Sequence, residues 1–293
     1  MTTMLGTVMA LRRYPVKSML GEDVTASGVT GAGLTGDRAL ALIHQTTGRV
    51  VSAKNPRLWR AMLTLTAATS DEGATKITFP DGKIAWSTDA DVDEVLSEFL
   101  GQPVTLTATP PEHAAMEHAD PDTVNEHGLT ADAQTTLVEI AAGAPPGTFF
   151  NFAPVHLITS ATLDQISELH PDGAEAAEVR YRPNVLISTP DLHGFTENDW
   201  LGEDLTIGDA VLRVMARTPR CAVPTLPHGT ITGRDPEALR IVARHNRVLP
   251  RVADTSPQPC AGVYAEVVRP GVISTGDAVS MRKSLTNRAL TTK

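Results

Sequence analysis

The chain has 293 residues, of which 41% are hydrophobic and 20% charged, a balance typical of globular proteins. Its net charge of −9 argues against a general nucleic-acid binder, which needs a basic face. No stretch is apolar for long enough to cross a bilayer, and charges interrupt the first twenty residues where a signal peptide needs its apolar segment. We therefore expect a cytoplasmic protein without a membrane span and without a nucleic-acid partner.

The N-terminal third predicts a compact, β-rich unit. Gly and Pro clusters separate three apolar or alternating segments, at residues 7–13, 40–44 and 63–67. Apolar residues then recur at helical spacing from Val92 to Leu100, and Gly101 is placed to end that helix. Residues 108–122 and 141–148 are rich in Pro and Ala without an apolar period, and we expect the first of these stretches to be a linker.

The remaining sequence predicts further strands with few helices between them. Strands are expected at residues 157–159, 185–188, 211–216 and 263–268. One helix is expected with Thr159 or Ser160 as its cap, and another with Asp235 at the N-cap and Pro236 at the first helical position. The last ten residues are expected to fray. This order does not favour a doubly wound parallel sheet and predicts a β-rich α+β protein in two parts.

Basic residues concentrate in two places within this acidic chain. Arg180 and Arg182 are two positions apart, so an extended backbone would project them to the same side, and Arg220 follows downstream. Lys17 and Ser18 form a second candidate anion contact. Guanidinium groups bind phosphate or carboxylate bidentately, which predicts an anion pocket. The alternative, ion pairing with surface carboxylates, is left open by the pattern itself.

Cys221 is the candidate reactive thiol. The chain has only two cysteines, too few for a disulfide framework, a four-cysteine zinc site or an iron–sulfur cluster. Cys221 follows a predicted strand, and Arg217 and Arg220 are expected to lower its pKa. A thiolate there can be a nucleophile, a redox thiol or a soft metal ligand, and the alternative is a small buried apolar side chain. Cys260, without a nearby basic residue, is interpreted as structural.

The histidines give weaker signals. His113, His118 and His127 are spaced so that no helical face collects them, and we expect solvated side chains in the linker rather than a metal site. His156 and Ser160 could belong to a hydrolase triad, but no G-x-S-x-G elbow accompanies them.

Six short motifs occur along the chain in a specific order: YPVKS at 14–18, GDR at 36–38, RYRPN at 180–184, WLG at 200–202, PRC at 219–221 and GVYA at 262–265. Taken in order and spacing, these motifs resemble the MOSC family, the C-terminal domain of molybdenum-cofactor sulfurases, preceded by its N-terminal β-barrel domain. In architecture the chain is similar to the amidoxime reducing component family. The resemblance implies an N-terminal β-barrel-like domain over residues 1–110 and a MOSC β-barrel domain with a few helices over residues 111–293.

The resemblance also implies a molybdenum cofactor (Mo-pyranopterin), not pyridoxal phosphate, held between the two domains. Cys221 would be the metal ligand and the catalytic residue. The positions that match cofactor contacts are Lys17, Ser18, Arg38, Thr159, Ser160, Thr162, Arg182, Asn184, Arg220 and Cys221.

The implied function is the reduction of small N-hydroxylated compounds, with electrons from a separate flavin or iron–sulfur reductase. Two alternatives remain at this point: a carrier or sulfur-transfer protein that binds the cofactor without substrate turnover, and a cofactor-free thiol enzyme. The loop at residues 222–228 departs from the two threonines and Asp-Pro that relatives often carry after the cysteine, which leaves the substrate open.

Overall fold

A closed barrel of seven strands forms the larger part of the molecule. The computed structural model describes residues 2–282, so the fraying expected for the last ten residues concerns a segment outside the described range. The barrel closes because β12 pairs with both β13 and β17. Around the barrel the strands are β12 (Val155–Thr159), β13 (Val185–Ser188), β1 (Thr2–Arg13), β19 (Ala278–Arg282), β14 (Asp204–Ile207), β15 (Ala210–Pro219) and β17 (Gln258–Arg269).

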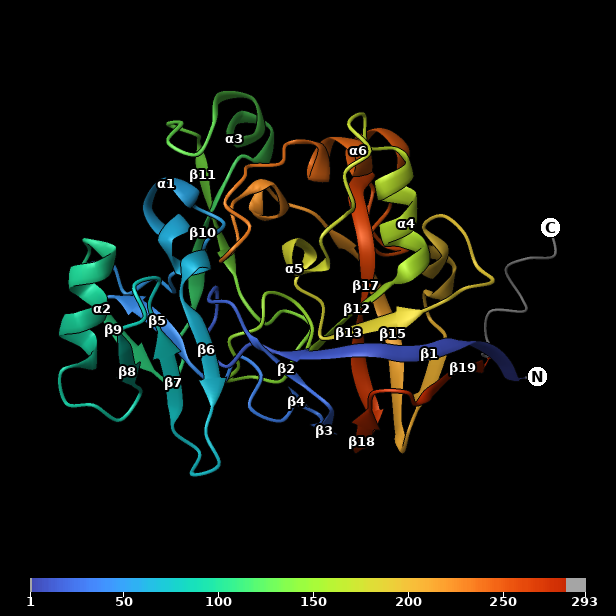
Figure 1. The fold of residues 1–293 in the computed structure, drawn as a ribbon, viewed down its shortest axis with the longest axis horizontal. Helices are drawn as coiled ribbons and strands as arrows, with labels where there is room; N and C mark the ends of the chain where they lie inside the picture. Colours follow the sequence, from blue (N-terminus) through green and yellow to red (C-terminus); the bar gives the residue numbers. More distant parts are fainter. Residues whose placement is uncertain (1, 283–293) are drawn as a thin grey trace.

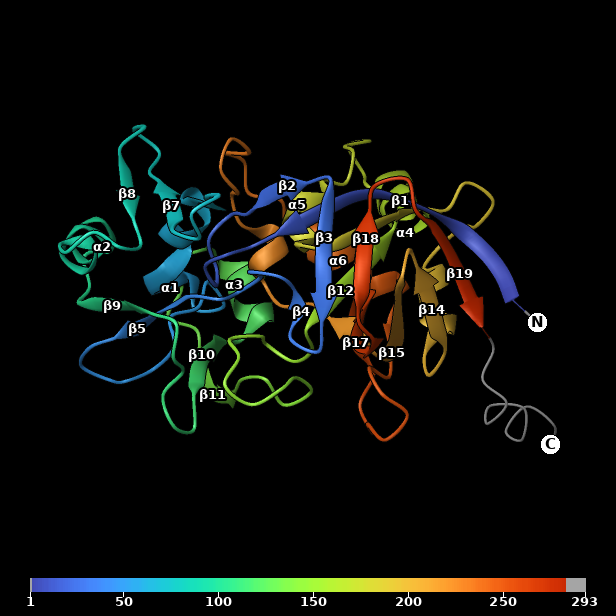
Figure 2. The same ribbon diagram turned by 90° about the horizontal axis from the view of Figure 1, so that it is seen from below.

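Strand β1 brings the N-terminus into a barrel otherwise built from the second half of the chain. It pairs antiparallel with β13 along Thr7–Leu11 and with β19 along Thr2–Thr7. Alternate side chains of these strands point inward and form an aliphatic core, as strand geometry requires when one face is buried. Three shorter strands lie against the barrel (Figure 2): β3 (Ala26–Thr30), β4 (Gly33–Leu34) and β18 (Gly271–Ser274). Strands β2 (Glu22–Val24) and β16 (Arg247–Val248) extend it at β1 and β17.

The rest of the N-terminal half forms small antiparallel sheets beside the barrel (Figure 1). They are β5 (Ala41–His44) with β9 (Val104–Thr107), β6 (Thr66–Thr69) with β7 (Thr75–Thr78) and β8 (Ile84–Trp86), and β10 (Ala115–Ala119) with β11 (Thr135–Glu139). The predicted helix is confirmed as α2 (Val92–Leu100), which ends at Gly101 in the left-handed conformation. Its apolar face packs into a core that includes Trp59 and Met62.

Five further helices are α1 (Pro56–Trp59), α3 (Pro121–His127), α4 (Ser160–Glu168), α5 (Glu178–Tyr181) and α6 (Glu237–His245). Three 3₁₀ turns span Arg60–Thr64, Thr196–Trp200 and Val223–Thr225. Both predicted helices are confirmed, and of the two possible caps of α4 it is Thr159 that accepts from the Thr162 backbone N–H. Helix α6 begins at Glu237, one residue later than predicted, and Asp235 accepts hydrogen bonds from its first backbone N–H groups. The β-rich α+β class is confirmed. Across residues 2–282, none of the helices has the length and apolar character that a membrane crossing requires.

Two local predictions are wrong. Residues 108–122 are not an irregular linker: β10 and the start of α3 lie there, because Met116 and Ala119 are buried and β10 pairs along its length with β11, which is distant in sequence. The strand expected at residues 63–67 begins only at Thr66, because Arg60–Thr64 form a 3₁₀ turn.

Candidate functional site

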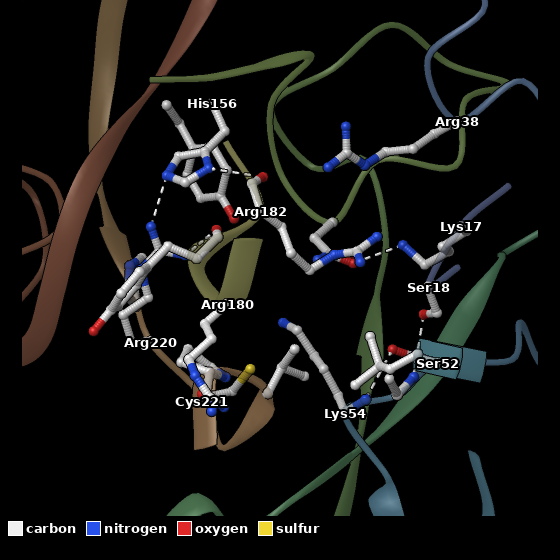
Figure 3. Close-up of a pocket in the computed structure, with 18 residues that line it drawn as sticks. Lys17, Ser18, Arg38, Ser52, Lys54, His156, Arg180, Arg182, Arg220 and Cys221 are labelled. Carbon is white, nitrogen blue, oxygen red and sulfur yellow. Dashed lines mark hydrogen bonds between the residues drawn. The ribbon is translucent and has the colours of Figure 1, made fainter. Parts of the chain in front are cut away.

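A polar cleft lies where the small sheets meet the barrel, and Cys221 is at its edge (Figure 3). Six cationic side chains line it, and among the described residues no Asp or Glu does. The cationic residues are Lys17, Arg38, Lys54, Arg180, Arg182 and Arg220. They come from the N-terminal segment, from α5 and from the loop after β15, so folding collects charge that the sequence disperses. A concave site with this charge attracts an anion.

Tyr14 fixes two of these arginines. Its ring is fully buried, and the guanidinium carbons of Arg182 and Arg38 lie 4.4 Å and 4.9 Å from its centre. The Tyr14 hydroxyl donates to the Pro183 carbonyl at 3.2 Å, and Asp37 accepts from the Tyr14 backbone N–H while it pairs with Arg38. The two cations are therefore held side by side against one aromatic residue, in an arrangement that cation–π attraction favours.

Arg182 and Lys17 have hydrogen-bonding capacity left for a ligand. Arg182 donates through Nη2 to the Met19 carbonyl at 2.7 Å, while its Nη1 is buried without a partner. Burial lowers the pKa of Arg182 to about 10. Lys17 donates to the Phe149 carbonyl and to Asn151, and burial lowers the pKa of its ammonium group well below its usual range. Within residues 2–282, neither group has a negatively charged hydrogen-bond partner, and a bound anion would supply one.

His156 links the third arginine to the barrel. Nη2 of Arg220 donates to Nε2 of His156 at 2.7 Å, so the His156 proton is on Nδ1 and donates to the Arg182 carbonyl at 3.2 Å. Burial, followed by the charge of Arg220, lowers the pKa of His156 well below 6.5 and keeps the ring neutral. Nε and Nη1 of Arg220 donate to the carbonyls of Ala261 and Tyr181. The guanidinium is thus held rigidly by groups that do not neutralise it.

Cys221 is positioned by the turn that follows β15. Arg180 donates to the Pro224 and Leu226 carbonyls of this loop, at 3.2 Å and 2.6 Å. Burial opposes ionisation of the thiol, but the neighbouring His118 and the positive charge of Lys54 outweigh it and lower the pKa of Cys221 to about 6. A thiolate at neutral pH is therefore the favoured form, as predicted, although through His118 and Lys54 in place of Arg217 and Arg220.

The structure brings six of the predicted site residues together and places four elsewhere. Those that line the cleft are Lys17, Ser18, Arg38, Arg182, Arg220 and Cys221. Thr159, Ser160, Thr162 and Asn184 do not line it. Asn184 is buried behind the cleft, where its Oδ1 accepts from the backbone of His156 and, at 3.4 Å, from Arg38.

A buried carboxylate lies at the start of α4, where the resemblance implied cofactor contacts. Thr159 and Thr162 each donate to Oε2 of Glu197 at 2.7 Å, and the Gly262 backbone N–H donates to its Oε1 at 2.9 Å. Ser160 instead accepts from the Thr189 backbone N–H. These hydroxyl groups join α4 to the Thr196–Trp200 turn, and their role as cofactor contacts stays a prediction.

The sequence did not predict several residues of the site. Lys54 points into the cleft and has no sequence signal beyond its charge (Figure 3). His118 is not a solvated linker residue: it lies on β10, half-buried beside Cys221. The prediction that Arg180 and Arg182 share an extended segment is wrong, because Arg180 is in α5 and Arg182 adopts a left-handed conformation (φ 55°). The feature of the sequence that pointed to both arginines was the local concentration of positive charge.

Comparison with protein families identifies two consecutive domains. Residues 5–120 match the MOSC N-terminal beta barrel domain, and residues 145–280 match the MOSC domain. This chain is a MOSC-domain protein. It is 25% identical over 300 residues to human (Homo sapiens) mitochondrial amidoxime-reducing component 1, a match that covers 94% of this chain and 82% of the relative. MOSC domains are associated with binding of the molybdenum cofactor.

Solved structures similar to this MOSC protein include the YUAD protein from Bacillus subtilis, at 12% identity and a TM-score of 0.43, with 97% of each chain covered. YiiM from Geobacillus stearothermophilus matches 45% of this chain and 55% of its own, at 17% identity and a TM-score of 0.33.

Proposed function

We propose that the cleft binds the molybdenum cofactor with Cys221 as the metal ligand, and that the protein reduces N-hydroxylated compounds. The observation that carries the proposal is a thiolate-forming cysteine at the edge of a cleft lined by six cations. Thiolates are preferred ligands of soft metal centres, and a phosphorylated pterin needs an anion site beside the metal. The distant similarity to an amidoxime-reducing component supports the reductive activity.

The residues present fit such a cofactor. The partnerless Nη1 of Arg182 is a buried donor, and such groups are rare unless a ligand or water satisfies them. Ser18 accepts from the Ala53 N–H at 3.1 Å, which leaves its hydroxyl proton free to donate. Lys17, Ser18, Arg38, Arg182 and Arg220 would hold the anionic part of the cofactor.

The cofactor, when bound, supplies the two-electron reduction chemistry. The substrate N–O bond breaks, and two electrons and two protons convert the N-hydroxylated compound to the reduced nitrogen compound and water. We propose that the electrons come from a separate flavin or iron–sulfur protein. The chain's own contribution is positional: the Tyr14 and His156 contacts hold Arg38, Arg182 and Arg220 in place, and His118 with Lys54 stabilises the thiolate.

The test is a comparison of Cys221→Ala with Cys260→Ala, expressed in a host that makes the cofactor. We expect the parent and Cys260→Ala to hold about one molybdenum per chain and to reduce benzamidoxime with a chemical electron donor. Cys221→Ala should lose both the metal and the activity, because Cys221 faces the cleft whereas Cys260 is fully buried in β17.

Full molybdenum content in Cys221→Ala would refute the ligand assignment. Loaded parent protein that reduces no N-hydroxylated compound would refute the reductase and favour a cofactor carrier. Parent protein without molybdenum from such a host would refute cofactor binding and favour a thiol enzyme.

A further inference from the structure

A second cavity is also lined by Cys221. It has a volume of about 770 Å³, and its wall includes part of β10, β11, the loop at residues 250–257 and the start of β17. We call it the outer chamber. It shares with the cofactor cleft the residues Lys54, Asn151, Pro219, Arg220, Cys221 and Tyr264. A molecule in the outer chamber would therefore reach Cys221 without displacing a ligand held by Lys17, Arg38 and Arg182, which line only the cleft.

One wall of the chamber is aromatic. The rings of Phe152 and Tyr264 lie 5.7 Å apart, and Tyr264 lines both cavities. The guanidinium carbon of Arg251 is 5.6 Å from the centre of the Phe152 ring. Tyr264, at the boundary between the two cavities, gives a flat molecule a surface on which to stack.

The chamber is also positively charged close to Cys221. Lys54, Arg217, Arg220, Arg247 and Arg251 line it, against Asp122, Glu139 and Asp254. Arg251 and Asp254 form an ion pair at 2.7 Å and neutralise each other. Asp122 and Glu139 are exposed to solvent. Arg217 and Arg247 hydrogen-bond only to backbone carbonyls in the described part of the chain. No carboxylate among their hydrogen-bond partners there compensates these two charges, whereas Arg220 is assigned to the cofactor.

We propose that the outer chamber is the substrate site and that it selects flat, anionic molecules, namely aromatic compounds that carry a carboxylate. That the reacting group is N-oxygenated rests on the proposed function, whereas the preference for an aromatic anion rests on the chamber itself. Uncompensated cations around a concave, partly desolvated space favour an anion and disfavour a cation.

The test uses benzamidoxime and 4-carboxybenzamidoxime as probes of the purified protein. Calorimetric titration should give a dissociation constant for the carboxylated probe that is lower by about 3–10-fold, the size expected of partly exposed ion pairing. Replacing the aromatic ring by cyclohexane should weaken binding of the carboxylated probe, because the stacking contact is lost. Raising the salt concentration should make the dissociation constants of the two amidoximes more similar, because salt screens the ion pairing.

The variant is Arg247→Gln, and the matched control is Arg244→Gln. Arg247 is exposed and has one side-chain hydrogen bond, at 3.4 Å to the Pro257 carbonyl, so its loss should leave the fold intact. Arg244 is an exposed arginine three residues earlier, on α6, that does not line the chamber. Arg247→Gln should reduce the preference for the carboxylated probe by about 2–5-fold, and Arg244→Gln should not change it.

Equal affinity for both amidoximes at low salt, or the same preference in Arg247→Gln as in the parent, would overturn the proposal. Turnover distinguishes it from the proposed function. Carboxylate-dependent binding without reduction by cofactor-loaded protein would leave the chamber assignment standing and refute the reductase.

Discussion

At the scale of single residues, the two cysteines show how surroundings decide the chemistry of one side chain. Cys221 lies beside His118 and Lys54, and the pKa of its thiol falls to about 6. Cys260 is fully buried in β17, and burial raises the pKa of its thiol to about 12. Both are free thiols. The protein therefore holds one thiolate and one inert thiol at neutral pH.

This difference predicts the pH dependence of alkylation in cofactor-free protein. Because folding lowers the pKa of Cys221 from its usual value of 9.0, the thiolate persists as the pH falls and is lost only through about pH 6. The rate of iodoacetamide modification at Cys221, followed by mass spectrometry, should be half its plateau near pH 6. Cys260 serves as the internal control and should stay unmodified at pH 7. A half-maximal rate near pH 9 at Cys221 would contradict the prediction.

At the scale of elements, the approach of β17 to β12 makes the site. Gly262 of β17 has a φ of +75°, and a Cβ atom there would lie 2.6 Å from Nε2 of His156 and 2.6 Å from the Leu157 carbonyl. The same position would be 3.2 Å from Nη2 of Arg220. Glycine is needed here because a side chain would occupy the space in which His156 and Arg220 form their hydrogen bond.

Gly262→Ala should therefore destabilise the protein by about 2–5 kcal/mol, the sum of left-handed strain and overpacking. Gly73→Ala is the matched control, because Gly73 has a φ of +87° with no atom within 4 Å of the added Cβ. It should cost only about 1–2 kcal/mol of strain. Urea unfolding followed by circular dichroism measures both, and equal losses would show that the contact with His156 and Leu157 is unimportant.

At the scale of the whole molecule, the first described strand pairs with the last: β1 lies between β13 and β19 and completes the barrel (Figure 1). The cleft is likewise shared, since Lys17 and Lys54 come from the first part of the chain and Arg182 and Cys221 from the second. The two parts cannot form the site separately.

This sharing predicts that residues 111–293 will not fold alone. The fragment lacks β1, which leaves the edges of β13 and β19 unpaired and exposes the barrel core. Thermal denaturation should show no cooperative transition for the fragment, whereas co-expression with residues 1–110 should restore one. A transition at the parent's temperature in the isolated fragment would show that β1 is dispensable.

Local patterns were sufficient for several features of this protein. Helical spacing from Val92 to Leu100 and the caps at Asp235 and Gly101 depend on neighbouring residues, and so the sequence predicted them. The order of the short motifs predicted the MOSC domains and pointed to Cys221, because such motifs are readable without knowledge of the fold. The domain limits and the roles of the site residues stay predictions.

Only the tertiary structure placed His118, Lys54 and His156 at the site, and only it showed Glu197 against the hydroxyls of Thr159 and Thr162. These contacts join residues that are far apart in the sequence, since His118 lies 103 and Lys54 167 positions before Cys221. Their formation depends on barrel closure and on the pairing of β10 with β11, which no local pattern encodes. Sequence determined which groups are available; long-range strand pairing decided which of them meet, because burial and charge proximity exist only after the chain has folded.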